Sequence, residues 1–331
     1  MTTNMTRAGR LVAVLVTQNR RAELETTLTR LLQTPPAQLA AVVVVDNASD
    51  DDTAAWLASH DSDRLVVHRC GRNLGGAGGF ETGMRLAVAR FDPDWLVLMD
   101  DDARPMPDAL ARFHARDRTD HAAWAAAVYH PDGRICDINR PSVNPFWHRR
   151  AFLRTAFGHG RDGFHIPESA YDAPEPQPID AASFVGLFVA RRGVGLAGYP
   201  DGKLFLYGED VLYTLRLSEA GGSIAFDPDI TFEHAYSTVD SAQRRFRPLW
   251  KSYYLHRNLL MVYRRAAGPM FWPALLVILP RWIARARHHR GDRGAYLRFL
   301  WRAVGDGLRA RTGVEHDEIV AASPESRAPA E

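Results

Sequence analysis

The stretch WLVLMDDD, from Trp95 to Asp102, decides the fold. Its five apolar residues can form a strand buried on both faces, as in a parallel sheet. The three aspartates then lie at the carboxyl end of that strand, where open α/β sheets bind ligands. Divalent cations such as Mg²⁺ prefer carboxylate oxygens and share them with substrate phosphates. Taken alone, the triplet fits two structures equally well. One is a metal site, and the other is a solvated turn in which Asp102 caps a helix.

Strand-like and helix-like segments alternate before this stretch. Strands are predicted at 11–17, 41–45 and 64–68, helices at 23–33, 53–59 and 80–90, and a glycine-rich loop at 71–79. This alternation predicts an α/β fold with a mostly parallel sheet between helices.

The alternation weakens after Asp102. Residues 141–178 are rich in proline and aromatic residues, which is typical of a long functional loop. Beyond it we predict a strand at 181–191, a helix at 209–220, a strand, turn and strand at 223–234, and a helix at 249–265. We therefore expect a catalytic domain over 1–240, ending near Ser237, and a C-terminal helical extension over 241–331 with a disordered tail.

Composition restricts the class of protein. A net charge of +2 gives no reason to expect nucleic acid or another strong polyanion as partner. Two cysteines, Cys70 and Cys136, are too few for a disulfide framework, and the first residues lack the apolar run of a signal peptide. We expect a cytoplasmic protein.

Two further clusters lie near predicted strand ends. Asp46, in VVVVDNASDDDT, is placed to accept a hydrogen bond from a nucleotide base, although simple turn formation explains the same residues. In NLGGAGGFETGM, Gly75, Gly76, Gly78 and Gly79 allow close backbone approach near a helix start, which suits a phosphate or a sugar. This loop lacks both the dinucleotide fingerprint and the lysine of a P-loop, which argues against NAD and ATP hydrolysis.

These motifs resemble the inverting family 2 glycosyltransferases of the GT-A fold, and among them the actinobacterial galactofuranosyltransferases. The similarity covers about 11–258. Its generic parts are VTQNR, VVDNASDDDT, DWLVLMDDD and LYGEDVLYTLRL, and its more discriminating part is NLGGAGGFETGM, from Asn73 to Met84.

The resemblance implies a role for each acidic residue. Asp100, Asp102 and His234 would hold Mn²⁺ or Mg²⁺, and Asp101 would lie near the donor sugar or ribose. Asp210 matches the catalytic base, with Glu209 beside it, so this assignment transfers only to within one residue. Without the resemblance, first-turn helix charge would explain the acidic pair, and a strand-end histidine is usually structural.

Other site residues follow from the same resemblance. Uridine and ribose contacts are assigned to Thr17, Arg20, Asp46 and Asn73, and the donor-sugar pocket to the segment from Gly75 to Phe80. Trp250, Tyr254, Arg257 and Asn258 match a segment that binds acceptor or pyrophosphate, or else packs in a core. Phe184, Val185 and Gly186 correspond to the acceptor side, and Trp147 either stacks on a sugar or packs in the core.

The C-terminal region suggests a membrane surface. Residues 270–280 are apolar but about half the length of a spanning helix. Residues 281–311 contain nine arginines and two aspartates among aromatic residues, which is typical of a basic interfacial helix. Helices packed on the catalytic domain with a solvated arginine face explain this pattern equally well. RNA binding is a third interpretation, which the resemblance disfavours.

Together these features predict a metal-dependent, inverting glycosyltransferase. The expected donor is UDP-galactofuranose and the expected acceptor is a hydroxyl of a polyprenyl-linked glycan, with peripheral contact to the inner face of the cell membrane. The alternatives are a rhamnosyltransferase that uses dTDP-rhamnose and a non-catalytic subunit that binds nucleotide sugars. A nucleotidyltransferase is disfavoured, because VTQNRRAELE stands where its Gly-rich basic signature would be.

Overall fold

The computed structural model describes residues 9–235 and 245–327. The predicted domain end at Ser237 and the predicted disorder of the last residues, 328–331, lie outside the described residues. The strands are β1 Leu11–Thr17, β2 Ala41–Asp46, β3 Leu65–Arg69, β4 Trp95–Asp100, β5 Ala103–Pro105, β6 Ala123–Tyr129, β7 Gln177–Ile179, β8 Leu187–Ala190 and β9 Ile224–His234. The helices are α1 Arg21–Gln33, α2 Thr53–Ala58, α3 Gly75–Phe91, α4 Ala109–Ala115, α5 Arg149–Arg154, α6 Arg191–Ala197, α7 Glu209–Glu219, α8 Lys251–Ala267, α9 Phe271–Ala284, α10 Arg293–Leu308 and α11 His316–Ala321.

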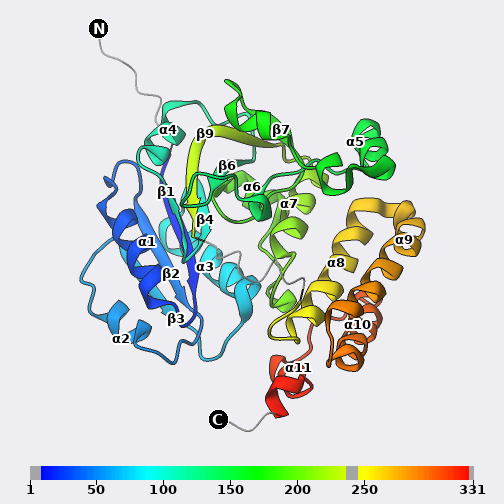
Figure 1. Cartoon of the computed structure of the whole chain (residues 1–331). Coiled ribbons are helices and arrows are strands. Elements are labelled where there is room, and N and C mark those ends of the chain that lie inside the picture. The colour runs from blue at the N-terminus through cyan, green and yellow to red at the C-terminus, as the bar shows by residue number, and fades with distance from the viewer. Residues whose placement is uncertain (1–8, 236–244, 328–331) are drawn as a thin grey trace.

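The described strands form one sheet in the order β3-β2-β1-β4-β8-β6-β9-β5, with β7 also paired to β9. Figure 1 shows this sheet with helices packed beside it. The predicted α/β class is confirmed. The first four strands are parallel, because helical crossovers connect them. The sheet is less parallel than predicted, since β8 runs antiparallel to both β4 and β6, and β5 and β7 run antiparallel to β9.

Both faces of the sheet are covered. One face packs against α3, α6 and α7, and the other packs against α1 and α4. The helix α3 comes unusually close, because a Cβ atom on Gly79 or Gly83 would lie 2.4 or 2.5 Å from a methyl group of Val16 or Val14. Close packing of this kind positions the start of α3 over the ends of β1 and β2.

Three predicted element boundaries were wrong. The glycine-rich segment is helical from Gly75, because tertiary packing overrides the low helix propensity of glycine. Only Leu187–Ala190 of the predicted strand at 181–191 is extended. The predicted strand, turn and strand at 223–234 is the single strand β9, whose register shifts opposite Ala126 and Ala127.

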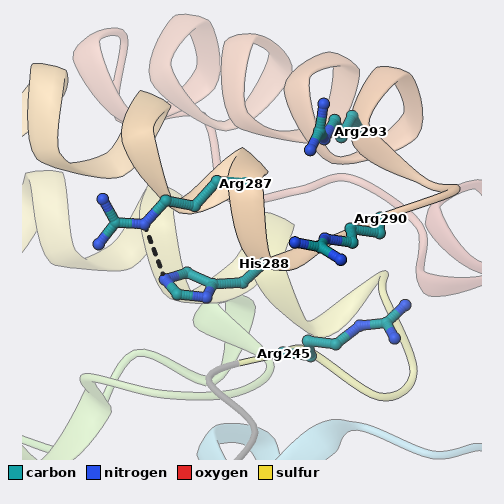
Figure 2. Close-up of a pocket in the computed structure, with 5 residues that line it drawn as sticks. All are labelled: Arg245, Arg287, His288, Arg290 and Arg293. Carbon is teal, nitrogen blue, oxygen red and sulfur yellow. Dashed lines mark hydrogen bonds between the residues drawn. The ribbon is translucent and has the colours of Figure 1, made fainter.

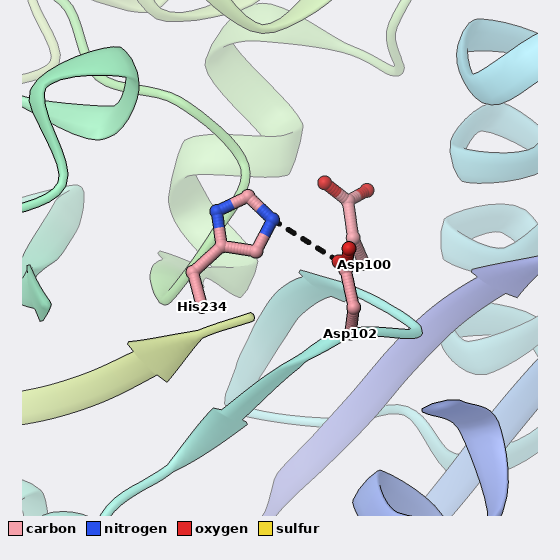
Figure 3. Close-up of side chains that lie close together, drawn as sticks. All are labelled: Asp100, Asp102 and His234. Carbon is pink, nitrogen blue, oxygen red and sulfur yellow. Dashed lines mark hydrogen bonds and ion pairs between the residues drawn. The ribbon is translucent and has the colours of Figure 1, made fainter. Parts of the chain in front are cut away.

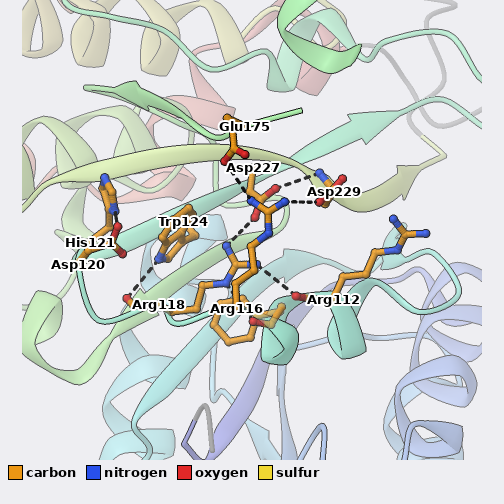
Figure 4. Close-up of polar contacts among 10 residues, drawn as sticks. Arg112, Arg116, Arg118, Asp120, His121, Trp124, Glu175, Asp227 and Asp229 are labelled. Atoms are coloured by element: carbon orange, nitrogen blue, oxygen red, sulfur yellow. Dashed lines mark hydrogen bonds and ion pairs between the residues drawn. The ribbon is translucent and has the colours of Figure 1, made fainter. Parts of the chain in front are cut away.

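A buried ion pair fixes that irregular part of β9. The guanidinium of Arg118 is 2.5 Å from Asp227, and both side chains are at most 1% exposed. Arg118 also donates to the carbonyls of Phe113 and Arg112 and lies over the ring of Trp124 (Figure 4). Because each charge has its partner, this pair connects the loop after α4 to β9 at the point where the register changes.

The long segment at 141–178 is more structured than the predicted loop. It contains α5 and several short helical turns, and it ends in β7, which pairs with β9.

The C-terminal helices form a second packed unit. The helices α8 and α10 share a core built on Tyr253, Tyr254 and Tyr296, and the hydroxyl of Tyr253 donates to Asp306 at 2.8 Å. The predicted helix at 249–265 is confirmed as α8. A smaller apolar cluster joins α8 to α7 of the sheet domain.

One described stretch, Lys251–His288, is long and apolar enough to cross a membrane by length and composition alone. Gly268, with φ of +50°, divides this stretch into α8 and α9. The ring of Trp282 in α9 packs against His256 and Tyr263 of α8, so the two helices lie side by side as a hairpin (Figure 1). The helices have 17 and 14 residues, whereas a spanning helix needs about 20.

Candidate active site

The carboxyl ends of the parallel strands bring the predicted polar residues together. Thr17 pairs with Asp46 across β1 and β2, and Val16 pairs with Asp100 across β1 and β4. The hydroxyl of Thr17 donates to Asp101 at 2.8 Å. The strand register alone therefore places these side chains at one edge of the sheet.

Pairing between β5 and β9 adds the histidine. Ala103 lies opposite His234, and the N–H of Ala235 donates to the carbonyl of Asp102 at 2.9 Å. Asp100, Asp102 and His234 each offer a ligand atom, and these atoms lie within 4.8 Å of one another (Figure 3). The predicted ligand set thus meets in space, as a metal site requires.

The contacts of His234 favour a positive charge, from a proton or a metal ion, between its ring and Asp102. Its Nδ1 is 2.7 Å from Oδ1 of Asn139, whose Nδ2 donates to Ser183, so the amide oxygen faces the ring and Nδ1 carries a proton. Nε2 then lies 3.1 Å from Asp102, where only a second proton or a metal ion makes the contact favourable. Burial lowers the pKa of His234, but the hydrogen bond to Asp102 and the nearby charge of Asp100 raise it to about 10.

Sequence analysis missed Asn139. It lies in a short helical turn 95 residues before His234, where no periodic pattern marks it. An oxygen that orients the far nitrogen of a metal-binding histidine is a usual feature of such sites, so a search for buried amides around His234 would have found it.

Arg20 balances part of the acidic cluster. Its guanidinium lies 2.7 Å from Asp102 and 3.2 Å from Asp101. Burial raises the pKa of Asp102, but hydrogen bonds to His234 and Arg20 lower it to about 2. Burial raises the pKa of Asp101 to about 7 despite the charge of Arg20. The cluster therefore carries more acidic groups than its two basic neighbours neutralise.

The acidic pair at the start of α7 faces the same region. Burial and, to a smaller extent, the charge of Asp100 raise the pKa of Asp210 to about 6. Burial and the charges of Asp210 and Asp100 raise the pKa of Glu209 well above its usual value. A hydrogen bond from the N–H of Val211, at 2.7 Å, holds Oδ1 of Asp210. The two carboxyls and Asp100 thus interact electrostatically across one site.

The predicted nucleotide contacts surround this cluster. Asp46 is fully buried and accepts from the N–H of Ser49 at 2.9 Å, while its Oδ2 has no hydrogen-bond partner among the described residues. Asn73 accepts from the N–H of Gly75 at 2.8 Å, and Asn47 donates to Asn73 at 3.0 Å. The only ion pair of this oxygen in that part of the chain is with the Nε of Arg69, at 3.6 Å, so it can still accept a hydrogen bond. Asn73, in contrast, holds the start of α3.

Packing within the protein explains most of the glycines in the predicted donor-sugar pocket. A Cβ atom on Gly75 would lie 2.0 Å from the carbonyl of Phe205, and one on Gly78 would lie 2.5 Å from the Leu74 side chain. Gly79 packs on Val16, and the N–H of Ala77 donates to the Phe205 carbonyl at 3.2 Å. Gly76 alone of the four faces an acidic residue, Glu209. Ligand contacts by these glycines stay predictions.

The remaining predicted residues divide into core and surface. Phe80 packs edge-on against Phe184 in the core, and Val185 is also buried. Gly186 has φ of +70°, and a Cβ atom there would lie 2.8 Å from Ala126. Trp147 is 40% exposed, so its sugar contact stays a prediction.

The predicted acceptor segment on α8 is mostly buried. Tyr254, Arg257 and Asn258 are at most 1% exposed, whereas Trp250 is partly exposed. These residues bond within the protein, as described below, and contact with an acceptor or a pyrophosphate stays a prediction.

Comparison with known proteins finds similarity to one family. Residues 12–166 match the model described as Glycosyl transferase family 2. The chain is 28% identical over 270 residues to galactofuranosyltransferase GlfT2 of Mycolicibacterium smegmatis, covering 74% of this chain and 39% of that protein. It is 29% identical over 221 residues to GlfT1 of the same organism, covering 66% of this chain and 68% of that protein. The chain thus spans well under half the length of GlfT2.

Solved structures support the fold. GalNAc-T7 with UDP, GalNAc and Mn²⁺ aligns with a TM-score of 0.56 at 15% identity, covering 77% of this chain and 47% of that one. The mannosyltransferase PcManGT from Pyrobaculum calidifontis, with GDP-Man and Mn²⁺, aligns with a TM-score of 0.53 at 18% identity, covering 96% and 79%.

Proposed function

The chain carries a family 2 glycosyltransferase domain of the GT-A fold and resembles mycobacterial galactofuranosyltransferases, and from this premise we propose that it transfers galactofuranose from UDP-galactofuranose to an acceptor hydroxyl with inversion. The observation that carries the proposal is the convergence of Asp100, Asp102 and His234 beside the acidic pair Glu209 and Asp210.

Asp100, Asp102 and His234 would hold Mn²⁺ or Mg²⁺. Two carboxylates and one imidazole suit either ion, and the contact between Nε2 of His234 and Asp102 favours a cation between them. When bound, the ion neutralises charge on the leaving diphosphate. Asn139 keeps the His234 ring in the orientation that directs Nε2 toward the carboxylates.

Asp210 is the proposed base. It accepts the proton of the acceptor hydroxyl as the hydroxyl oxygen bonds to the anomeric carbon and the bond from that carbon to the UDP oxygen breaks. A pKa of about 6 suits this role, because the group is ionised near neutral pH yet still basic. Glu209 has a pKa raised well above its usual value, so it is less suited to accept the proton.

The donor nucleotide would lie over the ends of β1 and β2. The Oδ2 of Asp46, which makes no hydrogen bond among the described residues, would accept from a base N–H, and Thr17, Arg20 and Asn73 would contact the uridine and ribose. Asp101 and the segment from Gly75 to Phe80 would border the sugar. Among these glycines, Gly76 alone faces the acidic pair, through Glu209.

The names of the relatives suggest the sugar, whereas the acceptor follows from our prediction of a lipid-linked glycan. We infer that the acceptor is a polyprenyl-linked glycan at the inner face of the cell membrane. This chain would reach it as a cytoplasmic protein with peripheral membrane contact.

A thermal-shift panel tests this proposal. Purified chain is mixed with UDP-galactofuranose, UDP-galactopyranose or dTDP-rhamnose, each with and without Mn²⁺. We expect UDP-galactofuranose with Mn²⁺ to raise the Tm most, because selective binding stabilises the folded state. A larger shift with dTDP-rhamnose would reverse the choice of donor. Selective binding without turnover of the donor would indicate a non-catalytic subunit instead.

A further inference from the structure

A basic hollow lies in the C-terminal helical region, away from the acidic site. It is lined by Arg245, Arg287, His288, Arg290 and Arg293 and has a volume of about 460 Å³. Figure 2 shows these side chains coming from three segments, before α8, after α9 and at the start of α10. Four guanidinium groups therefore share one open space.

Little within the described residues balances this charge. Asp292 approaches Arg245 at 3.6 Å, and no other ion pair to the four arginines is found in the described ranges. Nε of Arg245 is buried without a hydrogen-bond partner there. Buried donors in proteins are nearly always paired, so the unpaired Nε of Arg245 indicates that the hollow lacks an acceptor. An anion would provide that acceptor.

An apolar stripe leads to the hollow. Trp272, Leu276 and Ile283 of α9 are 62%, 79% and 38% exposed. Their spacing of four and seven residues places them on one face of the helix, and Arg287 follows one turn after Ile283. Exposed apolar residues beside arginines match a membrane surface, where acyl chains lie next to phosphate groups.

We propose that the basic hollow binds the phosphate groups of anionic lipids while the α9 stripe enters the apolar layer. Arginine suits this role, because its planar guanidinium makes paired hydrogen bonds to phosphate oxygens. The hairpin of α8 and α9 would then lie on the membrane. This surface rests on the proposed function and assigns its peripheral membrane contact to named residues, and it needs neither donor nor metal.

Vesicle flotation with the full chain tests the proposal. The vesicles are phosphatidylcholine with or without phosphatidylglycerol, and pyrophosphate is the soluble probe in a parallel thermal-shift assay. The test protein carries Arg287→Gln, Arg290→Gln and Arg293→Gln. Its control carries Arg90→Gln, Arg134→Gln and Arg192→Gln, three exposed arginines of the sheet domain with the same change in charge.

We expect the parent to float only with phosphatidylglycerol. The test protein should bind about 100-fold more weakly, since each arginine near the surface contributes roughly a factor of five. The control should bind like the parent. Leu276→Ser should also weaken flotation while leaving any pyrophosphate stabilisation unchanged, which separates lipid from a soluble phosphate. Equal flotation of test and control proteins, or pyrophosphate binding without flotation, would overturn the proposal.

A second inference concerns the loop before α7. Phe205, Tyr207 and Gly208 all have positive φ angles, of 68°, 69° and 81°. Such conformations persist only where surrounding contacts hold them, and they gather at functional sites. The loop ends immediately before Glu209 and Asp210, so its shape sets where α7 begins.

Two residues of α8 hold this loop. Nδ2 of Asn258 lies 3.1, 2.8 and 2.8 Å from the carbonyls of Leu204, Leu206 and Tyr207. Arg257 donates to the Leu204 carbonyl at 2.6 Å and to Oδ1 of Asn258 at 2.8 Å.

The surroundings of Arg257 show that it acts within the protein. Its side chain is fully buried, and its guanidinium lies 5.3 and 5.1 Å from the ring centres of Tyr253 and Tyr254. Its Nη2 and Nε bond to the Leu204 carbonyl and to Asn258, whereas its Nη1 has no hydrogen-bond partner among the described residues. The two bonds make Arg257 a structural tie. The tie joins the helical unit to the start of α7.

We infer that Asn258 and Arg257 are positioning residues for Asp210. This inference rests on the proposed function. Asn258→Asp removes the donor but keeps the shape of the side chain, and Arg257→Lys is a milder change that keeps the charge. Each should lower kcat about 10- to 100-fold, because small misplacement of a catalytic group is costly. The KM for the donor and the stabilisation by Mn²⁺ with UDP should stay unchanged.

Tyr296→Phe is the matched control. It removes a buried hydrogen bond from α10 to the Trp282 carbonyl of α9 without touching the loop, so stability should fall while kcat stays near the parent value. Parent-like kcat in both loop variants would overturn the positioning role, as would a donor KM that changes in step with kcat. A parent chain without transfer activity would instead contradict the proposed function.

Discussion

Two buried groups of charges in this protein differ in their balance. Arg118 and Asp227 form one pair, in which each charge has its partner. At the sheet edge lie five acidic residues, Asp100, Asp101, Asp102, Glu209 and Asp210, and in the described part of the chain their only ion pairs are those with Arg20 and His234. A balanced pair is complete within the chain, whereas an excess of buried acid favours a cation from outside. The first group therefore indicates a role in the fold and the second a role in chemistry.

The largest effect should follow loss of a metal ligand. Asp100→Asn removes one carboxylate of the unbalanced group, and we expect transfer to fall about 10⁴-fold, since a catalytic metal supplies several kcal/mol. The metal-free variant should be at least as stable as the parent, because one source of repulsion is gone. Transfer assays and thermal unfolding in EDTA measure both effects. Transfer within tenfold of the parent would remove Asp100 from the metal site.

Loss of the base should have the next largest effect. Asp210→Asn should lower transfer about 10³-fold, within the usual range for a general base. Stabilisation by Mn²⁺ with UDP should remain, because Asp210 is not a proposed ligand. Glu209→Gln is the control, and its loss should be smaller. If Glu209→Gln is instead the more damaging change, the two roles are exchanged.

Breaking the balanced pair should affect stability instead. Arg118→Met leaves Asp227 buried without a partner, and we expect the free energy of unfolding to fall by about 3 kcal/mol or more. Transfer by the folded fraction should change little, since Arg118 lies outside the acidic cluster. Denaturant unfolding measures the loss.

An exposed pair gives the scale for that measurement. Arg134 and Asp132 are 71% and 53% exposed, so Arg134→Met should lower the free energy of unfolding far less than Arg118→Met does. Equal losses in the two variants would show that burial does not distinguish the pairs.

The charged residues of the sheet edge were easier to predict from the sequence than those of the balanced pair. The aspartates at 100–102 and Asp46 follow apolar strands, so a parallel sheet brings them to one edge by register alone. His234 came from the resemblance, and the pairing of β5 with β9 shows why it is there. These residues were predictable because a strand pattern or a motif marks them.

Other contacts have no such local mark. Arginine is usually exposed, so nothing in the sequence predicted that Arg118 and Arg257 would be almost completely buried. Asn139 reaches His234 only through the folded chain. The glycines from Gly75 looked like a loop by propensity, yet Phe205, more than 120 residues later, accepts a hydrogen bond from the helix they begin.

The smallest expected effect is a pH dependence that separates the two groups. Burial raises the pKa of Asp210 from 3.8 to about 6, and the base acts only when ionised. Transfer should therefore fall about tenfold for each pH unit below about 6. Stability has the opposite sign. Between these two pKa values the folded state binds more protons than the unfolded state, so the Asp210 contribution disfavours folding progressively as pH rises from about 4 to about 6.

Unfolding of metal-free protein across this range measures that contribution. The parent should lose more stability, or gain less, than Asp210→Asn as pH rises, because the variant lacks the titrating group. Arg90→Gln should show the same slope as the parent, since this exposed arginine lies away from both buried groups and the change leaves the sheet-edge carboxyls intact. If Asp210→Asn follows the parent at every pH, the excess of buried acid does not raise the pKa of Asp210, and the contrast between the two groups loses its electrostatic basis.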